Sequence, residues 1–127
     1  RTLNGAAMEL LERVGLQDAA QLPAAQLSHG QRRQLELAMA LATRPQALLL
    51  DEPMAGMGPS ETEAMSALVA ELGRDHAVLL VEHDMDVVFR LAERISVLVY
   101  GSVIASGRPE AVRADPEVQR AYLSEEG

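Results

Sequence analysis

The sequence predicts an α/β fold built around a parallel sheet. Residues 47–50 and 77–81 form two continuous apolar runs, which are typical of strands buried on both faces of such a sheet. Between them, residues 59–72 place apolar side chains such as Met65 and Leu72 at helical spacing. The order strand, helix, strand is that of a βαβ unit, whose two strands run parallel.

The first 45 residues predict helices and a connector, but no strand. Residues 6–14 have helical spacing and end at Gly15, a residue that suits a helix C-terminus. Residues 17–26 contain Pro23 and predict an irregular connector. The longest helix of this half is expected from Ser28 to about Thr43.

The remaining elements follow the second apolar run. We expect a helix, a third strand, a tight turn into a short hairpin partner that closes at Gly107, and two short helices with Pro near their first positions. The helix is expected at residues 84–92 and the third strand at residues 94–100. The turn is expected at residues 101–102 and the hairpin partner at residues 103–105. The two short helices are expected at residues 109–113 and 116–123.

Composition excludes several classes of function. The 127 residues, 48% of them apolar, suffice for one globular unit. A net charge of −8 argues against a nucleic-acid partner, whose phosphates attract basic surfaces. No apolar run approaches the roughly 18 residues of a membrane span and no leader precedes the first helix, so we expect a cytosolic chain.

The basic residues are eleven Arg and no Lys. A phosphate-binding loop of the form GxxxxGK[ST] requires a Lys, so this chain cannot contain one. The chain also begins with Arg1 rather than Met. We therefore expect it to be the C-terminal part of a longer protein.

Ser28, Gly30 and Gln31 belong to a turn that begins the longest helix. Ser28 at the N-cap and Gln31 three residues later fit a capping box, which is the purely structural interpretation. Gly30, however, costs the helix about 1 kcal/mol relative to Ala and leaves backbone N–H groups uncovered. Because an open helix N-terminus attracts anions, we favour contact with phosphate.

Asp51 and Glu52 follow the first strand at its carboxyl end, where open α/β sheets bind ligands. The alternative is a pair of solvated loop residues. Adjacent carboxylates there could hold a hydrated Mg²⁺ through Asp51 and polarise a water through Glu52. His83 follows the next strand and would bond a terminal phosphate and the attacking water, whereas His29 and His76 have no such placement.

These three motifs, in this order, resemble the nucleotide-binding subunit of ATP-binding cassette (ABC) transporters from about residue 22 to the end. The resemblance identifies residues 27–31 as the signature motif and residues 48–52 as the Walker B strand of an incomplete P-loop NTPase-like fold. It makes Glu52 the catalytic base and His83 the switch histidine. Residues 55–58 correspond to the D-loop, in which Gly58 stands where the family commonly has Asp.

The resemblance implies ATP and Mg²⁺ as cofactors and a second ATPase subunit paired head to tail. Ser28, Gly30 and Gln31 would contact the partner's ATP, and Asp51, Glu52 and His83 the chain's own. Residues 1–45 would belong to the helical subdomain and residues 46–127 to the α/β core. Transmembrane permease subunits would hold the protein at the cytoplasmic face of the membrane.

Residues 34–42, 54–57, 82–85 and 121–126 look like the subfamily that serves branched-chain amino acid importers. The ATPases of urea importers and of the lipopolysaccharide exporter are similar in the same segments. A non-catalytic interaction module with vestigial ATPase residues is a further alternative. So is a soluble cassette ATPase of translation or DNA repair.

The Walker A loop, the adenine-stacking aromatic residue and the Q-loop would all precede Arg1. We therefore predict that these residues alone bind ATP weakly or not at all and do not hydrolyse it. The family's Walker A strand lies between the strand before His83 and the strand that begins near Arg94. Without it, two strand edges lack a partner. We expect these two strands to pair with each other across the gap, or strand exchange between two chains to pair the edges in a homodimer.

Overall fold

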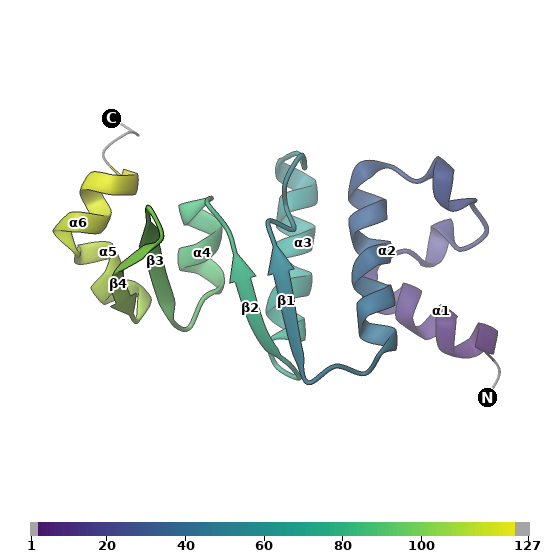
Figure 1. Ribbon diagram of the computed structural model, residues 1–127. Coiled ribbons are helices and arrows are strands. Elements are labelled where there is room, and N and C mark those ends of the chain that lie inside the picture. The colour runs from purple at the N-terminus through teal and green to yellow at the C-terminus, as the bar shows by residue number, and fades with distance from the viewer. Residues whose placement is uncertain (1–2, 124–127) are drawn as a thin grey trace. The chain divides into compact units, whose positions relative to one another are not determined.

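The computed structural model describes residues 3–123. The chain divides into two compact units, Arg1–Val81 and Glu82–Gly127. Figure 1 labels their helices and strands. None of the described helices has the length and apolar character that a membrane span requires.

The first unit begins with two helices that pack against each other, α1 (Leu3–Val14) and α2 (His29–Ala42). Gly15 follows α1 with a φ of 82°, a left-handed conformation that ends a helix and suits Gly. The connector contains only the short 3₁₀ turns Gln17–Ala19 and Ala24–Gln26. The predicted helices and the irregular connector are therefore confirmed.

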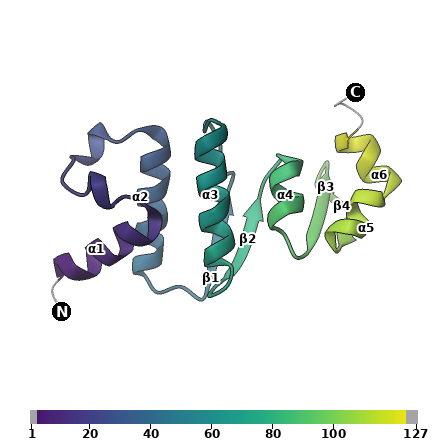
Figure 2. The same cartoon turned by 180° about the vertical axis from the view of Figure 1, so that it is seen from behind.

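The rest of the first unit is the predicted βαβ arrangement. Strands β1 (Ala47–Asp51) and β2 (Ala77–Val81) pair in parallel, with Ala47 opposite Ala77 and Asp51 opposite Val81. Helix α3 (Pro59–Leu72) connects them. It lies on a single face of the two strands, in front of them in Figure 2 and behind them in Figure 1.

The prediction that both strands are buried on both faces is wrong for the residues that the structure describes. Leu48, on one face of β1, is 4% exposed, whereas Leu49, on the other, is 75% exposed. Leu79 and Val81 of β2 are likewise more than half exposed. Continuous apolar runs suit strands that are covered on both faces of a sheet, whereas α3 covers only one face of these two strands.

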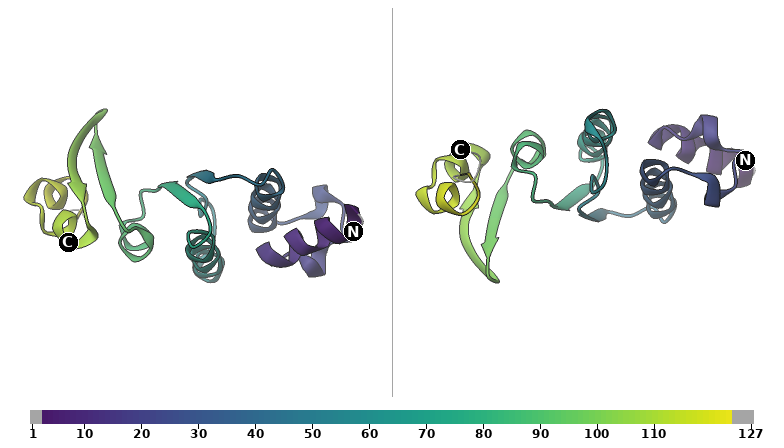
Figure 3. Two further views of the ribbon diagram at one scale, coloured as in Figure 1. Left: turned by 90° about the horizontal axis from the view of Figure 1, so that it is seen from below. Right: turned by 90° about the horizontal axis from the view of Figure 1, so that it is seen from above.

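As far as residue 123, the second unit consists of a hairpin, three short helices and one π turn. Its core contains Ile95 and Val97 of the hairpin with Val112 and Val118 of the helices. Figure 3 shows the last two helices beside the hairpin in both views. The elements are α4 (Met85–Leu91), β3 (Ile95–Val99), β4 (Ser102–Gly107), α5 (Pro109–Ala114), α6 (Pro116–Val118) and the π turn Gln119–Leu123.

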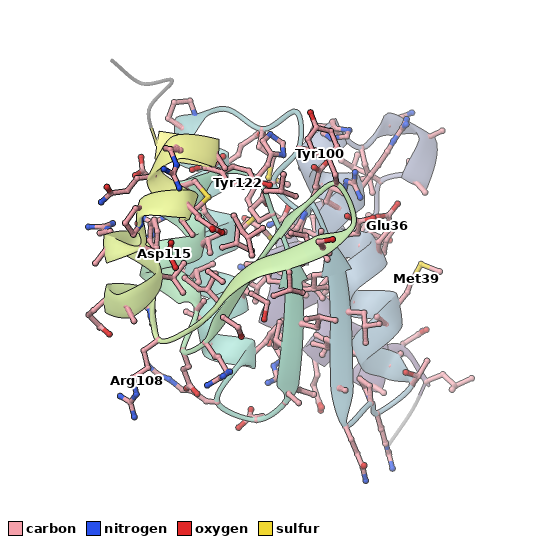
Figure 4. The ribbon with its side chains drawn as sticks, turned by 60° about the vertical axis from the view of Figure 1, so that its left-hand side comes forward. Glu36, Met39, Tyr100, Arg108, Asp115 and Tyr122 are labelled. Atoms are coloured by element: carbon pink, nitrogen blue, oxygen red, sulfur yellow. The ribbon has the colours of Figure 1, made fainter. Side chains whose placement is uncertain are left out.

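The hairpin turns one residue earlier than predicted. Tyr100 and Gly101, rather than Gly101 and Ser102, occupy the turn, with φ angles of 48° and 76°. Two left-handed residues match the twist of a hairpin, and this requirement places the turn. Tyr100 lies at the exposed tip (Figure 4), while the Tyr122 hydroxyl donates a hydrogen bond of 2.7 Å to the Leu98 carbonyl.

The described strands form two separate sheets, β1–β2 and β3–β4. The expectation that the strand before His83 pairs with the strand from residue 94 is therefore wrong for this part of the chain. Strand β3 pairs with β4, because a two-residue turn brings these neighbours together at little entropic cost. Strand exchange, and the division into residues 1–45 and 46–127, stay predictions.

Candidate functional site

The signature turn is a complete capping box at the N-terminus of α2. The Ser28 Oγ accepts a hydrogen bond of 3.2 Å from the Gln31 backbone N–H, and the Gln31 side chain accepts one of 2.9 Å from the Ser28 N–H. These bonds do not use the N–H groups of His29 and Gly30. The turn is thus both a cap and a helix N-terminus with polar groups suited to an anion.

A hollow of about 100 Å³ opens beside this turn. Gly30 is buried there, and a Cβ at its position would lie 3.2 Å from a carboxylate oxygen of Glu61 in α3. Ligand pockets usually have roughly 300 Å³ or more, so this hollow cannot hold a nucleotide by itself. The lining residues are Ser28, Gly30, Gln31, Gln34, Met57, Glu61, Ala64 and Met65.

The acidic pair lies where β1 ends beside the end of β2. Asp51 is the last residue of β1 and is exposed, and Glu52 is half-buried. The Glu52 N–H donates a hydrogen bond of 2.8 Å to the Val81 carbonyl, which ties the pair to the neighbouring strand. Glu52 has a φ of 45°, an uncommon conformation for a residue with a side chain. The strand ladder and this turn together hold its backbone.

The segment after Glu52 is a tight loop that the signature turn contacts directly. The Ala55 N–H donates to the Glu52 carbonyl at 3.1 Å. The His29 ring hydrogen-bonds the Ala55 carbonyl through Nε2 at 2.7 Å. Sequence reasoning left His29 without a role, because a partner 26 positions along the chain gives no local signal.

His83 belongs to the second unit and follows β2 by two residues in the sequence. Its side chain is 75% exposed, and its backbone N–H donates to Oε1 of the adjacent Glu82 at 3.1 Å. Asp84 caps α4 by accepting hydrogen bonds from the Asp86 and Val87 N–H groups. The proximity of His83 to the acidic pair stays a prediction.

Within the first unit, hydrogen bonds therefore connect the signature turn to the loop after Glu52, and that loop to the acidic pair. Within residues 3–123, no three His, Asp or Glu side chains gather as a ligand set for a metal ion. Mg²⁺ commonly takes only one or two protein carboxylates, with water and phosphate oxygens for the rest. The exposed Asp51 carboxylate fits such a site.

Two family models and several known proteins match this chain. The ABC transporter family matches residues 3–55, and the branched-chain amino acid ATP-binding cassette transporter family matches residues 102–123. LivG of Escherichia coli, a high-affinity branched-chain amino acid transport ATP-binding protein, is 45% identical over 117 residues, or 91% of this chain and 46% of LivG. The chain belongs to the ABC transporter family.

Two further relatives bear on this member of the family. BraF of Pseudomonas aeruginosa has the same description as LivG and is also 45% identical, with 91% of this chain and 46% of BraF aligned. A solved ATP-binding cassette of an ABC transporter superposes with a TM-score of 0.83 at 31% identity, covering 94% of this chain and 49% of that structure. The α/β fold is thus confirmed, and the chain spans about half the length of the curated relatives it matches.

Proposed function

We propose that this chain is the C-terminal part of the ATP-binding and ATP-hydrolysing subunit of an ABC transporter. One observation carries the proposal. An open helix N-terminus in a signature-like turn is hydrogen-bonded to the loop that follows two carboxylates at the end of a parallel strand. A matching solved structure with a TM-score of 0.82 is described as the ADP conformation of an ATP-binding cassette, which supports a nucleotide ligand.

The roles of the site residues follow from their chemistry. Ser28 presents its hydroxyl, Gly30 its backbone N–H and Gln31 its side-chain NH2 group to the phosphates of ATP bound by a second subunit. Asp51 would hold Mg²⁺ through water, and the metal ion, when bound, would neutralise charge at the phosphates. Glu52 accepts a proton from the attacking water, and His83 orients that water and the terminal phosphate.

These groups contribute parts of two different ATP sites and the whole of neither. The hollow beside the signature turn is too small for a nucleotide, and the sequence contains no Lys for a phosphate-binding loop. We therefore expect residues 1–127 alone to bind ATP weakly or not at all, and to show no hydrolysis. Measurable turnover by the isolated chain, lost in Glu52→Gln, would contradict this expectation.

The exposed face of the β1–β2 sheet supports the same interpretation. Leu49, Leu79 and Val81 leave contiguous apolar surface on two adjacent strands. Burying such surface is worth roughly 25 cal/mol per Å², so an uncovered sheet face favours association. We expect the rest of the longer polypeptide to cover this face. Strand exchange in a homodimer stays our proposal for the unpaired strand edges when that segment is absent.

The transported substrate is proposed from the relatives. LivG and BraF are named for branched-chain amino acid transport, and the corresponding family matches residues 102–123. We infer that the protein lies at the cytoplasmic face of the membrane with a second ATPase subunit and permease subunits. Its ATP hydrolysis would drive the import of these amino acids through the permease. A urea importer and a lipopolysaccharide exporter are the competing systems.

Steady-state ATP hydrolysis by the complete natural polypeptide tests the proposed reaction. General base catalysis typically contributes 10²–10⁴-fold, so we expect Glu52→Gln to lower kcat by roughly that factor. Glu71→Gln, a matched change on the exposed surface of α3, should leave kcat unchanged. No hydrolysis by the wild-type polypeptide would favour the interaction module. Equal activity of the two variants would instead refute the role of Glu52 as the general base.

Uptake by the assembled transporter tests the substrate. Vesicles that contain the ATPase and its permease should accumulate labelled leucine when supplied with ATP, and unlabelled valine or isoleucine should compete. Urea uptake without leucine uptake would assign the chain to the urea system.

A further inference from the structure

His29 makes a direct connection between the signature turn and the loop after the acidic pair. Its Nε2 lies 2.7 Å from the Ala55 carbonyl oxygen. Because a carbonyl oxygen can only accept, Nε2 carries the proton and donates. The bond is short for an N–H···O contact, and it joins residues 26 positions apart.

The loop is shaped to receive the His29 ring. Gly56 has a φ of 76°, which residues with a side chain rarely adopt. A Cβ on Gly56 would lie 3.1 Å from Nε2 and 3.2 Å from Cδ2 of the ring. Gly at this position thus provides both the left-handed turn and the space in which the ring packs.

The connection continues through backbone hydrogen bonds to the proposed catalytic base. The Ala55 N–H donates to the Glu52 carbonyl at 3.1 Å, and the Glu52 N–H donates to the Val81 carbonyl at 2.8 Å. Glu52 itself has a φ of 45° and so depends on its surroundings to keep this conformation. His29, Ala55, Glu52 and Val81 form one hydrogen-bonded series from the signature turn to the end of β2.

We propose that His29 is a positioning residue that couples the signature turn to the backbone of Glu52. This inference rests on the proposed ATPase function and extends it within a single subunit. Ser28 and Gly30 adjoin His29 on the helical turn that would meet the partner's nucleotide, while Glu52 would act on the chain's own. A displacement of the turn therefore moves the loop that holds the base.

The test uses four forms of the complete natural polypeptide: wild type, His29→Phe, His29→Gln and His76→Phe. Phe at position 29 keeps a ring but has no donor, whereas the Gln amide can restore an N–H. His76→Phe is the matched control, because the His76 ring also contacts a backbone carbonyl, that of Leu72 at 3.1 Å, but at the far end of α3. The measurements are amide hydrogen exchange across residues 52–58 and steady-state ATP hydrolysis.

We expect His29→Phe to accelerate exchange at the Ala55 amide by about three- to tenfold, the effect of losing one hydrogen bond. The value of kcat should fall by a similar factor with KM for ATP unchanged, because Glu52 loses orientation rather than ATP losing a contact. His29→Gln should recover most of both effects. His76→Phe should alter neither.

Unchanged exchange across residues 52–58 in His29→Phe would overturn the connection itself. Faster exchange with wild-type kcat would retain the contact and overturn the positioning role. A wild-type polypeptide that hydrolyses no ATP would refute the proposed function, and exchange would then still decide whether His29 holds the loop.

Discussion

Replacement of Gly56 by Ala tests how tightly the signature turn and the loop are fitted together. An L-residue in the left-handed conformation of Gly56, with its φ of 76°, costs about 1–2 kcal/mol. The new Cβ would meet the His29 ring at 3.1 Å, so the ring must move and its bond to Ala55 weakens, at a net cost of about 1 kcal/mol. We expect the free energy of unfolding to fall by about 2–3 kcal/mol.

Gly101 provides the matched comparison. It has the same φ of 76°, but nothing lies within 4 Å of the position that its Cβ would take. Gly101→Ala should therefore cost only the conformational part, about 1–2 kcal/mol. Because the two glycines belong to different units, each loss is best measured by amide exchange within its own unit.

A double-mutant cycle within the first unit isolates the contact. Urea denaturation followed by far-ultraviolet circular dichroism would compare Gly56→Ala, His29→Ala and the double variant. Without the ring, the Cβ at position 56 meets nothing from His29, so the two losses should be less than additive by about 1 kcal/mol. Additivity within about 0.3 kcal/mol would refute the fit between ring and loop.

Three further predictions concern the same unit. Ser28→Ala removes the cap oxygen that accepts from Gln31 and should lower the free energy of unfolding by about 1 kcal/mol in urea denaturation. Gly58 caps α3 without a side-chain hydrogen bond and has open space around it, so Gly58→Asp should raise the free energy of unfolding by about 0.5 kcal/mol, a gain that 1 M NaCl reduces. Leu48→Ala, on the covered face of β1, should cost about 2–5 kcal/mol, whereas Leu49→Ala, on the open face, should cost under about 1 kcal/mol; similar losses would indicate that the open face is covered in solution.

Local patterns in the sequence were sufficient for the element order. The spacing of apolar residues predicted α3 and β2 with the bounds that the structure has, and Ser28 and Gln31 predicted the capping box with both of its bonds. Such features depend on neighbours within one turn or one strand, so the sequence contains their cause. The chain order of the three motifs likewise predicted the family.

Contacts between distant residues were decided by the tertiary structure alone. The sequence could not predict that one face of β1 is open, because an apolar run records the partners a strand is suited to and not those it has. Nor did it assign His29, whose ring reaches a loop 26 residues away. A side chain's bonding partner depends on where the folded backbone brings a carbonyl oxygen, and spacing along the chain does not contain that information.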